Sequence, residues 1–145
     1  MRFFLDANIC LDLLDTTRKN SPVSVGWYLA LKDNMENEFF FSGDFITTLY
    51  YVLTERKGHD ALRVVKAIDA LSEEIFPVYP EHADFILAKE AFFDGVFDDF
   101  EDLMALESAV RTGAKRFLTH DMRLLALGNY KNIPIEKPEI DSTKS

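Results

Sequence analysis

Short apolar runs alternate along the chain with longer stretches in which apolar residues recur every three or four positions. The short runs are typical of buried strands. They predict strands at residues 2–5, 39–41, 75–78, 116–119 and 133–135. The last run contains Pro134, which cannot donate a hydrogen bond to a central ladder, so we expect it at an edge of the sheet.

The longer stretches carry the periodicity of amphipathic helices. Their apolar positions include Ile9, Leu13, Ile46, Leu49, Val64, Ile68, Ile86, Ala91, Leu103 and Leu106. A further helix is expected over residues 25–35, with Ser21 as its cap and Pro22 in its first turn. Strands that alternate with helices predict an α/β fold, in which a parallel sheet is covered by helices on both faces.

Acidic residues follow two of the predicted strands. Asp6 comes directly after the first strand, and Asp121 follows the fourth after Thr119 and His120. The carboxyl ends of parallel strands meet at one edge of the sheet, which is where such folds bind ligands. Each aspartate could instead cap a helix that begins just after it. We therefore expect a site at this edge, with helix capping as the open alternative.

The charge of the chain is concentrated in one segment. The formal net charge is −9, and seven of the 25 acidic residues fall between Glu90 and Val110, where there is no Lys or Arg. The rest of the chain is nearly neutral, with 18 acidic and 16 basic residues. Within the segment, Asp99 and Asp102 share a helical stripe with Leu103, so Asp102 is directed toward the interior. A capping box of Asp99 and Asp102 is the alternative.

If Asp6, Asp102 and Asp121 converge, their mutual repulsion must be relieved. Two carboxylates about 4 Å apart repel by about 4 kcal/mol at an effective dielectric of 20. Protonation or a bound cation would relieve it, and carboxylate oxygens without soft ligands favour Mg²⁺ or Mn²⁺. Such an ion neutralises charge at a phosphodiester and lowers the pKa of a bound water.

The length and composition indicate one soluble domain. We expect a single domain over residues 1–138 and a flexible tail at 139–145. The single cysteine excludes a disulfide framework. We expect no signal peptide, no membrane span and a cytoplasmic location. The acidic balance argues against a basic nucleic-acid-binding surface of the usual kind.

Four segments, taken in order, resemble the PIN-domain family, in particular the small bacterial branch that includes toxins of VapC type. They are Phe3–Asn8, Ile46–Leu53, Asp99–Leu103 and Phe117–Asp121, and the resemblance runs from Arg2 to about Pro138. It implies a Rossmann-like, three-layer α/β/α fold with a sheet of about five strands in the order 3-2-1-4-5. It also implies a metal-dependent endoribonuclease that uses Mg²⁺ or Mn²⁺.

The resemblance assigns roles to individual residues. Asp6, Asp102 and Asp121 match the catalytic acids that hold the metal, and Asp99 matches an additional acid of this branch. Asn8 and Thr119 match supporting polar residues. The chain departs from the family at Thr48, where an acid is usual, and at His120, where Arg or Lys is frequent.

Three functions follow from these observations. The first is cleavage of single-stranded RNA, with Arg18 and Lys19 as RNA contacts near the site. The second is a PIN-like scaffold that binds RNA or a protein without cleaving, which the missing acid at Thr48 favours. The third, a phosphotransfer receiver domain, lacks the lysine expected after its fourth strand. The resemblance further implies a small antitoxin protein as a partner, and a homodimer.

Overall fold

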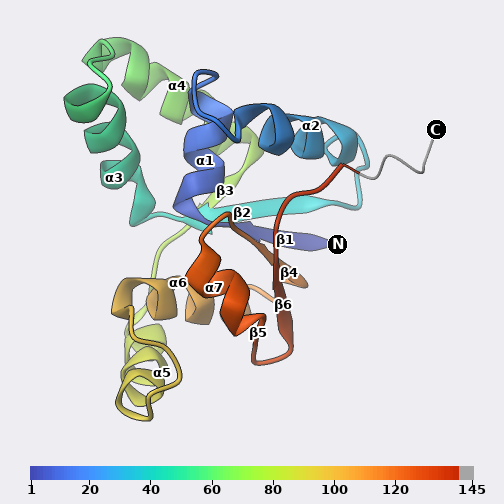
Figure 1. Ribbon diagram of the computed structural model, residues 1–145, viewed down its shortest axis with the longest axis vertical. Helices are drawn as coiled ribbons and strands as arrows, with labels where there is room; N and C mark the ends of the chain where they lie inside the picture. Colours follow the sequence, from blue (N-terminus) through green and yellow to red (C-terminus); the bar gives the residue numbers. More distant parts are fainter. Residues whose placement is uncertain (141–145) are drawn as a thin grey trace.

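The computed structural model describes residues 1–140 as a sheet between two layers of helices (Figure 1). The strands are β1 (Arg2–Leu5), β2 (Glu38–Ser42), β3 (Phe76–Val78), β4 (Arg116–Leu118), β5 (Asn129–Tyr130) and β6 (Ile133–Glu136). The helices are α1 (Ala7–Leu14), α2 (Ser21–Leu31), α3 (Phe45–Tyr51), the π-helix η1 (Val52–Arg56), α4 (Ala61–Glu74), α5 (His82–Phe93), α6 (Phe100–Arg111) and α7 (Met122–Leu127).

The sheet has the order β3-β2-β1-β4-β6-β5. All neighbouring strands are parallel except β5 and β6. The predicted order of the five expected strands is confirmed, because the run at 133–135 is β6 and pairs with β4. The structure adds a sixth strand, β5, which pairs antiparallel with β6 across a turn where Lys131 and Asn132 have positive φ. A two-residue strand has too few positions to show a period, so the sequence pattern could not reveal it.

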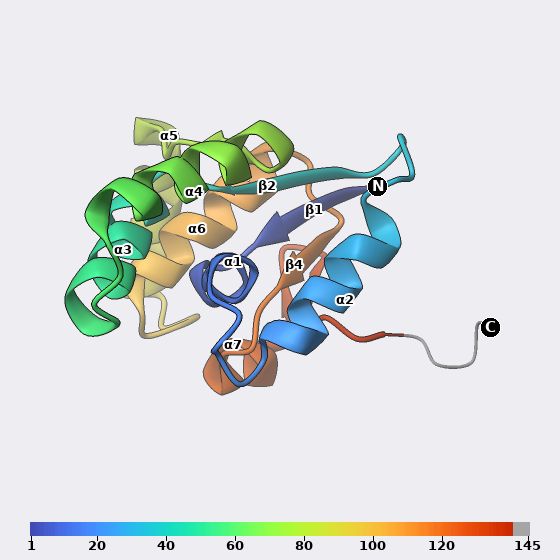
Figure 2. The same cartoon turned by 90° about the horizontal axis from the view of Figure 1, so that it is seen from above.

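Both faces of the sheet are buried, which explains the uninterrupted apolar runs. Phe3, Leu5, Phe39 and Phe41 point into the core beneath helices α1 to α4. Phe4 and Phe117 point the other way, into the core beneath α5, α6 and α7, and stack with ring centroids 5.7 Å apart. Figures 1 and 2 show the two helical layers on opposite sides of the strands.

The strand register places the predicted site at one edge. Leu5 at the end of β1 is paired with Leu118 at the end of β4, so Asp6 and Thr119 follow side by side. The amide of Asp6 donates to the Leu118 carbonyl at 2.9 Å. The carboxyl end of β2 lies on the other side of β1. The two segments that carry Asp6 and Asp121 therefore begin next to each other.

Three local expectations were wrong. The run that contains Pro134 was expected at an edge of the sheet, but β6 lies between β4 and β5, because the short strand β5 pairs with its outer side. The helix expected over 25–35 runs from Ser21 to Leu31, and its N-cap is Asn20 rather than Ser21. Ser21 is inside the helix and its hydroxyl donates to the Asp12 carbonyl. At the other end the Asn37 side chain donates to the carbonyl of Leu31, which stops the helix before residue 35.

The expected tail begins at Glu139, and residues 141–145 of it lie outside the described part of the chain. Ile140, the last described residue, lies against α2: a Cβ added at Gly26 would come within 2.5 Å of its Cδ1. In the part of the chain that is described, no helix combines the length and the apolar content needed to cross a bilayer.

Candidate active site at the carboxyl edge of the sheet

Asp6 is the buried centre of the site. It is the N-cap of α1, only 5% exposed, and its carboxylate accepts the Ala7 amide at 2.8 Å. The Thr119 hydroxyl donates to its Oδ2 at 2.7 Å and the Asn8 amide nitrogen donates to the same oxygen at 3.0 Å. All three donors are neutral. The carboxylate is thus held in one orientation without a positive charge beside it.

Asn8 and Thr119 join α1 to the loop after β4. Thr119 is fully buried, and its hydroxyl oxygen accepts from the Asn8 side chain at 3.1 Å and from the Asp121 amide at 3.0 Å. The Asn8 side-chain oxygen accepts the amide of His120 at 3.0 Å. These bonds fix the loop that carries His120 and Asp121 against the start of α1.

Asp99 and Asp121 are helix caps, as the alternative interpretation expects. The Asp99 carboxylate accepts the Asp102 amide at 3.1 Å, and that of Asp121 accepts the amides of Arg123 and Leu124. Capping does not account for Asp102, however. Its side chain is half-buried and accepts no hydrogen bond from any group in residues 1–140, so the capping box is only half formed.

Burial and neighbouring negative charges raise the pKa of two acids at this edge, Asp6 and Asp102. Burial raises the pKa of Asp102 to about 7, and the negative charges of Asp6, Asp99, Asp121 and Glu101 contribute in that order. Burial also raises the pKa of Asp6, although the Thr119 hydroxyl acts in the opposite direction. Mutual repulsion of this kind is what a bound cation removes.

Of the remaining buried acids of the described chain, Asp12, Asp84 and Glu107 pair with Arg or Lys, whereas Asp15 has only a histidine nearby, which is charged when protonated. Asp12 pairs with Arg18 at 2.8 Å, Asp84 with Arg111 at 3.0 Å, Glu107 with Lys131 at 2.6 Å, and Asp15 lies 3.9 Å from His59. Asp6 has no basic group within 4 Å among residues 1–140. The edge of the sheet is where the fold leaves a buried carboxylate without a positive charge.

The carboxylates at this edge suit a hard divalent cation, but they do not provide a complete coordination shell. Carboxylate oxygens are the ligands that Mg²⁺ and Mn²⁺ prefer, and Mg²⁺ commonly takes one or two of them and keeps its waters. Among residues 1–140, no three acidic, histidine or cysteine side chains stand where they could hold one metal ion together. The residues therefore fit the chemistry of such an ion, with most of its shell left to water.

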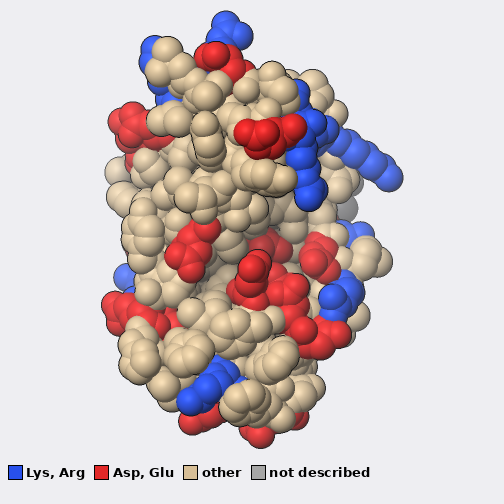
Figure 3. Space-filling model, turned by 90° about the vertical axis from the view of Figure 1, so that its left-hand side faces the viewer, with Lys and Arg blue, Asp and Glu red and all other residues tan. Residues whose placement is uncertain are grey.

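Thr48 lies on α3, across a cleft from α6. The cleft, of about 730 Å³, is lined by Thr48, Phe100 and Glu101 and by the loop after β2, which includes Asp44. The Asp44 side chain makes no capping bond to α3. Figure 3 shows this face of the molecule hollowed near its middle, with acidic side chains in and around the hollow. Asp44 was not among the predicted site residues, because no periodic pattern marks this loop.

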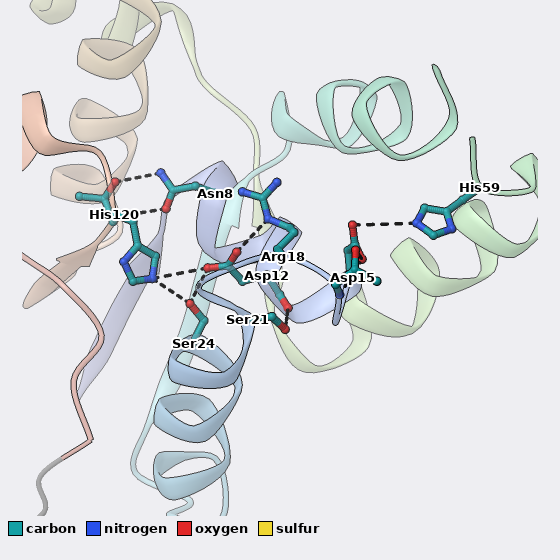
Figure 4. A network of polar contacts seen from close by, with 10 residues as sticks. Asn8, Asp12, Asp15, Arg18, Ser21, Ser24, His59 and His120 are labelled. Carbon is teal, nitrogen blue, oxygen red and sulfur yellow. Dashed lines mark hydrogen bonds and ion pairs between the residues drawn. The ribbon is translucent and has the colours of Figure 1, made fainter. Parts of the chain in front are cut away.

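His120 faces Asp12 of α1 and Ser24 of α2 (Figure 4). Its Nε2 lies 3.0 Å from the Ser24 hydroxyl and 3.4 Å from Asp12 Oδ2, and Ser24 donates to that same Asp12 oxygen at 2.6 Å. Burial lowers the pKa of His120, while Asp12 acts to raise it. Asp12 and Ser24 were absent from the predicted site. A polar residue inside the apolar helix 7–14 was the available signal for Asp12.

A three-layer fold with acids at the carboxyl edge of a parallel sheet is the arrangement of PIN-like domains and of some other α/β proteins, so similarity to a known protein decides the family. A curated relative, Ribonuclease VapC1 of Aquifex aeolicus, is 32% identical over 122 residues, which span 83% of this chain and 81% of the relative. The chain belongs to the VapC family of PIN domains. No protein-family profile matches the chain.

Solved structures share the fold at lower identity. Mycobacterium tuberculosis VapC20, described as a sarcin-ricin loop cleaving toxin, superposes with a TM-score of 0.71 at 17% identity and covers 91% of this chain and 99% of its own. VapBC2 of Rickettsia felis, bound to a DNA fragment from its promoter, gives 0.68 at 15% identity, with 94% and 98% covered. VapBC-1 of nontypeable Haemophilus influenzae gives 0.65 at 17% identity, with 94% and 98% covered.

Proposed function

We propose that this protein is a metal-dependent endoribonuclease, which hydrolyses phosphodiester bonds of single-stranded RNA with Mg²⁺ or Mn²⁺ at the carboxyl edge of the sheet. The observation that carries the proposal is that Asp6 has no basic partner among residues 1–140, whereas buried Asp12, Asp84 and Glu107 each pair with Arg or Lys there. The relative named Ribonuclease VapC1 supports RNA as the substrate.

In this proposal Asp6, Asp102 and Asp121 hold the ion, directly or through water, and Asp99 adds negative charge beside them. When bound, such an ion neutralises charge on the scissile phosphate and lowers the pKa of a bound water. Asn8 and Thr119 keep the Asp6 carboxylate in one orientation. The hydroxyl of Thr48 can bind a water at the cleft, but it adds no negative charge.

The test is cleavage of single-stranded RNA with Mg²⁺ or Mn²⁺. We expect Asp6→Asn and Asp102→Asn to lower kcat/KM by at least about 100-fold, because each removes a negative charge from the ion's site. Asp69→Asn, on the exposed face of α4, is the matched control and should retain full activity. Full activity in either site variant, with unchanged circular dichroism, would show that the substituted aspartate does not hold a catalytic ion.

A second candidate is a PIN-like scaffold that binds RNA or a protein without cleaving it. Two observations favour it: Thr48 stands where the family has an acid, and no three donor side chains are gathered among residues 1–140. Calorimetry with Mn²⁺ separates the candidates. Binding that is lost in Asp102→Asn supports the nuclease, and folded wild-type protein that binds no Mn²⁺ at millimolar concentration supports the scaffold.

We further propose a small antitoxin protein as a partner, which would place a basic side chain or a helix against the acids at the carboxyl edge of the sheet. The VapBC structures of the neighbours motivate this proposal. Co-purification with the product of a small adjacent reading frame tests it, and Asp102→Lys should weaken the complex. The homodimer that the resemblance implies stays a prediction, which light scattering of the purified protein checks.

A further inference from the structure

A small polar cleft lies beside the acidic edge, where two distant segments bring basic side chains together. It measures about 270 Å³ and is lined by Asp12, Thr17, Arg18, Lys19, Asn20 and Lys57. Arg18 and Lys19 come from the loop after α1, and Lys57 comes from the end of η1. In a chain with a net charge of −9, three basic side chains on one cleft are a local reversal of charge.

Arg18 is held rigidly on the wall of the cleft. Its Nε donates to Asp12 Oδ1 at 2.8 Å, and Asp12 is only 1% exposed. Figure 4 shows the two terminal nitrogens of Arg18 pointing away from Asp12. A guanidinium that is fixed through Nε can still donate from both terminal nitrogens to a planar or tetrahedral oxyanion. The buried aspartate therefore orients the arginine without using its outer donors.

The two lysines are available as charges. Neither Lys19 nor Lys57 forms an ion pair within residues 1–140, although Lys57 is near enough to Asp15 to help hold its pKa down, after the Thr17 hydrogen bond. Asn20 is the N-cap of α2 and its side chain makes no capping bond. The amino end of an 11-residue helix adds partial positive charge to the same cleft.

A helix and a chain of hydrogen bonds connect this cleft to the acidic edge of the sheet. Asp12 lies six residues after Asp6, which is about 9 Å along the axis of α1. The bonds that run from Asp12 through Ser24 and His120 reach the loop of Thr119 and Asp121. A single strand whose scissile phosphate is at the acids would therefore place a neighbouring phosphate within reach of the cleft.

We propose that this cleft binds a backbone phosphate of the nucleic-acid strand, adjacent to the phosphate that is cleaved, with Arg18, Lys19 and Lys57 as its donors. The inference rests on the proposed function and adds to it: the acids provide the chemistry, and this cleft provides the affinity that an acidic protein otherwise lacks. Contacts of this kind are indifferent to base sequence.

The experiment measures binding separately from cleavage. The probe is a short single-stranded 2′-O-methyl RNA, kept intact as checked on a gel, and its dissociation constant is measured by fluorescence anisotropy with Mg²⁺ at several salt concentrations. The test protein carries Lys19→Met and Lys57→Met. The matched control carries Lys89→Met on α5 and Lys115→Met before β4, which make the same change in charge away from the cleft.

We expect the test protein to bind roughly tenfold more weakly, and its log–log salt slope to fall by up to about 0.7, the contribution of the one phosphate that the cleft neutralises. The control should lose much less affinity and keep its slope. For cleavable RNA, the test variant should raise KM and leave kcat nearly unchanged. Arg18→Lys should lose part of the affinity, because an ammonium cannot make the same paired contact.

Two other results would overturn the inference. If wild-type protein cleaves RNA but the test and control proteins bind the probe equally, this cleft is not a phosphate site and the proposed function stands. If wild-type protein neither binds the probe nor cleaves RNA, both proposals fail together.

Discussion

The two ends of helix α6 place carboxylates in opposite electrostatic surroundings. Near its carboxyl end, Asp84 is 2% exposed and meets the Ser108 hydroxyl at 3.2 Å and the Arg111 guanidinium at 3.0 Å. Near its amino end, Asp102 faces the negative charges of Asp6, Asp99 and Asp121, and no basic side chain in the described chain lies within 4 Å of it. Asp84 is fully buried and has a compensating charge, whereas Asp102 is half-buried and has none within 4 Å among residues 1–140.

The pKa directions follow the neighbouring charges and not the helix. The dipole of α6 favours a carboxylate at its amino end and disfavours one at its carboxyl end. Burial alone would raise the pKa of Asp84, yet the hydrogen bond from Arg111 holds that pKa below its usual range. The pKa of Asp102 is raised to about 7 at the end where the dipole is favourable. The carboxyl end of α6 compensates the charge of Asp84, and the amino end leaves the charge of Asp102 uncompensated.

Removing Arg111 should leave Asp84 without a compensating positive charge, as Asp102 is at the other end of α6. We expect Arg111→Met to lower the free energy of unfolding by about 3 kcal/mol, because it leaves Asp84 buried and unpaired. Urea unfolding at neutral pH measures the change. Arg63→Met, on the exposed surface of α4, is the control and should cost less than about 0.5 kcal/mol. A loss as small as that in Arg111→Met would show that the pair does not stabilise the fold.

The hydroxyl of Thr119 should matter most for the acidic end. Thr119→Val keeps the shape but removes the donor to Asp6 and the acceptor for Asn8 and the Asp121 amide. We expect a loss of about 2 kcal/mol in stability, because buried polar groups are left unpaired. Thr119→Ser restores the oxygen and should recover most of the stability and the activity. Equal stability of the Val and Ser variants would contradict this account.

Much of this arrangement could be predicted from sequence because it depends on local patterns. The strand runs, and the expectation that the segments of Asp6 and Asp121 meet at one edge, follow from apolar periodicity and from the parallel topology. The strand order was implied by the family resemblance. Asp99 and Asp121 could be recognised as caps, and both are caps. The family resemblance supplied the roles of the acids, which periodicity alone cannot give.

What the sequence could not predict depends on contacts between distant segments. The pairing of Asp84 with Arg111 spans 27 residues, and the link between Ser24 and His120 spans 96. The π-helix η1, which brings Lys57 to the cleft beside Arg18, has no periodic signature of its own. Such contacts form only when the layers pack, so neither spacing nor propensity marks them in advance.

Neutralising Asp102 should stabilise the metal-free protein in a pH-dependent way. Burial and the neighbouring carboxylates raise its pKa to about 7 in the folded state, from an ordinary value of 3.8, so the folded state binds the extra proton and stability falls as pH rises between these two values. Asp102→Asn should therefore match wild type near pH 4 and exceed it by about 1–2 kcal/mol at about pH 8, after allowance for its partial exposure. Urea unfolding in EDTA measures it, and a constant difference at both pH values would contradict it.

A bound cation should compensate the negative charge at the amino end of α6, as Arg111 compensates that of Asp84 at the carboxyl end. With Mn²⁺ at ten times its dissociation constant, the folded state should gain about 1.4 kcal/mol, which for a domain of this size raises Tm by roughly 3–5 °C. Asp102→Asn should lose most of that gain, because its neutral amide no longer needs a counter-charge. The Asp84 pair is already compensated, so Asp84→Asn should melt lower but keep the full Mn²⁺ response. An equal Mn²⁺ response in wild type and Asp102→Asn would place the ion elsewhere and leave the charge at this edge without a cation.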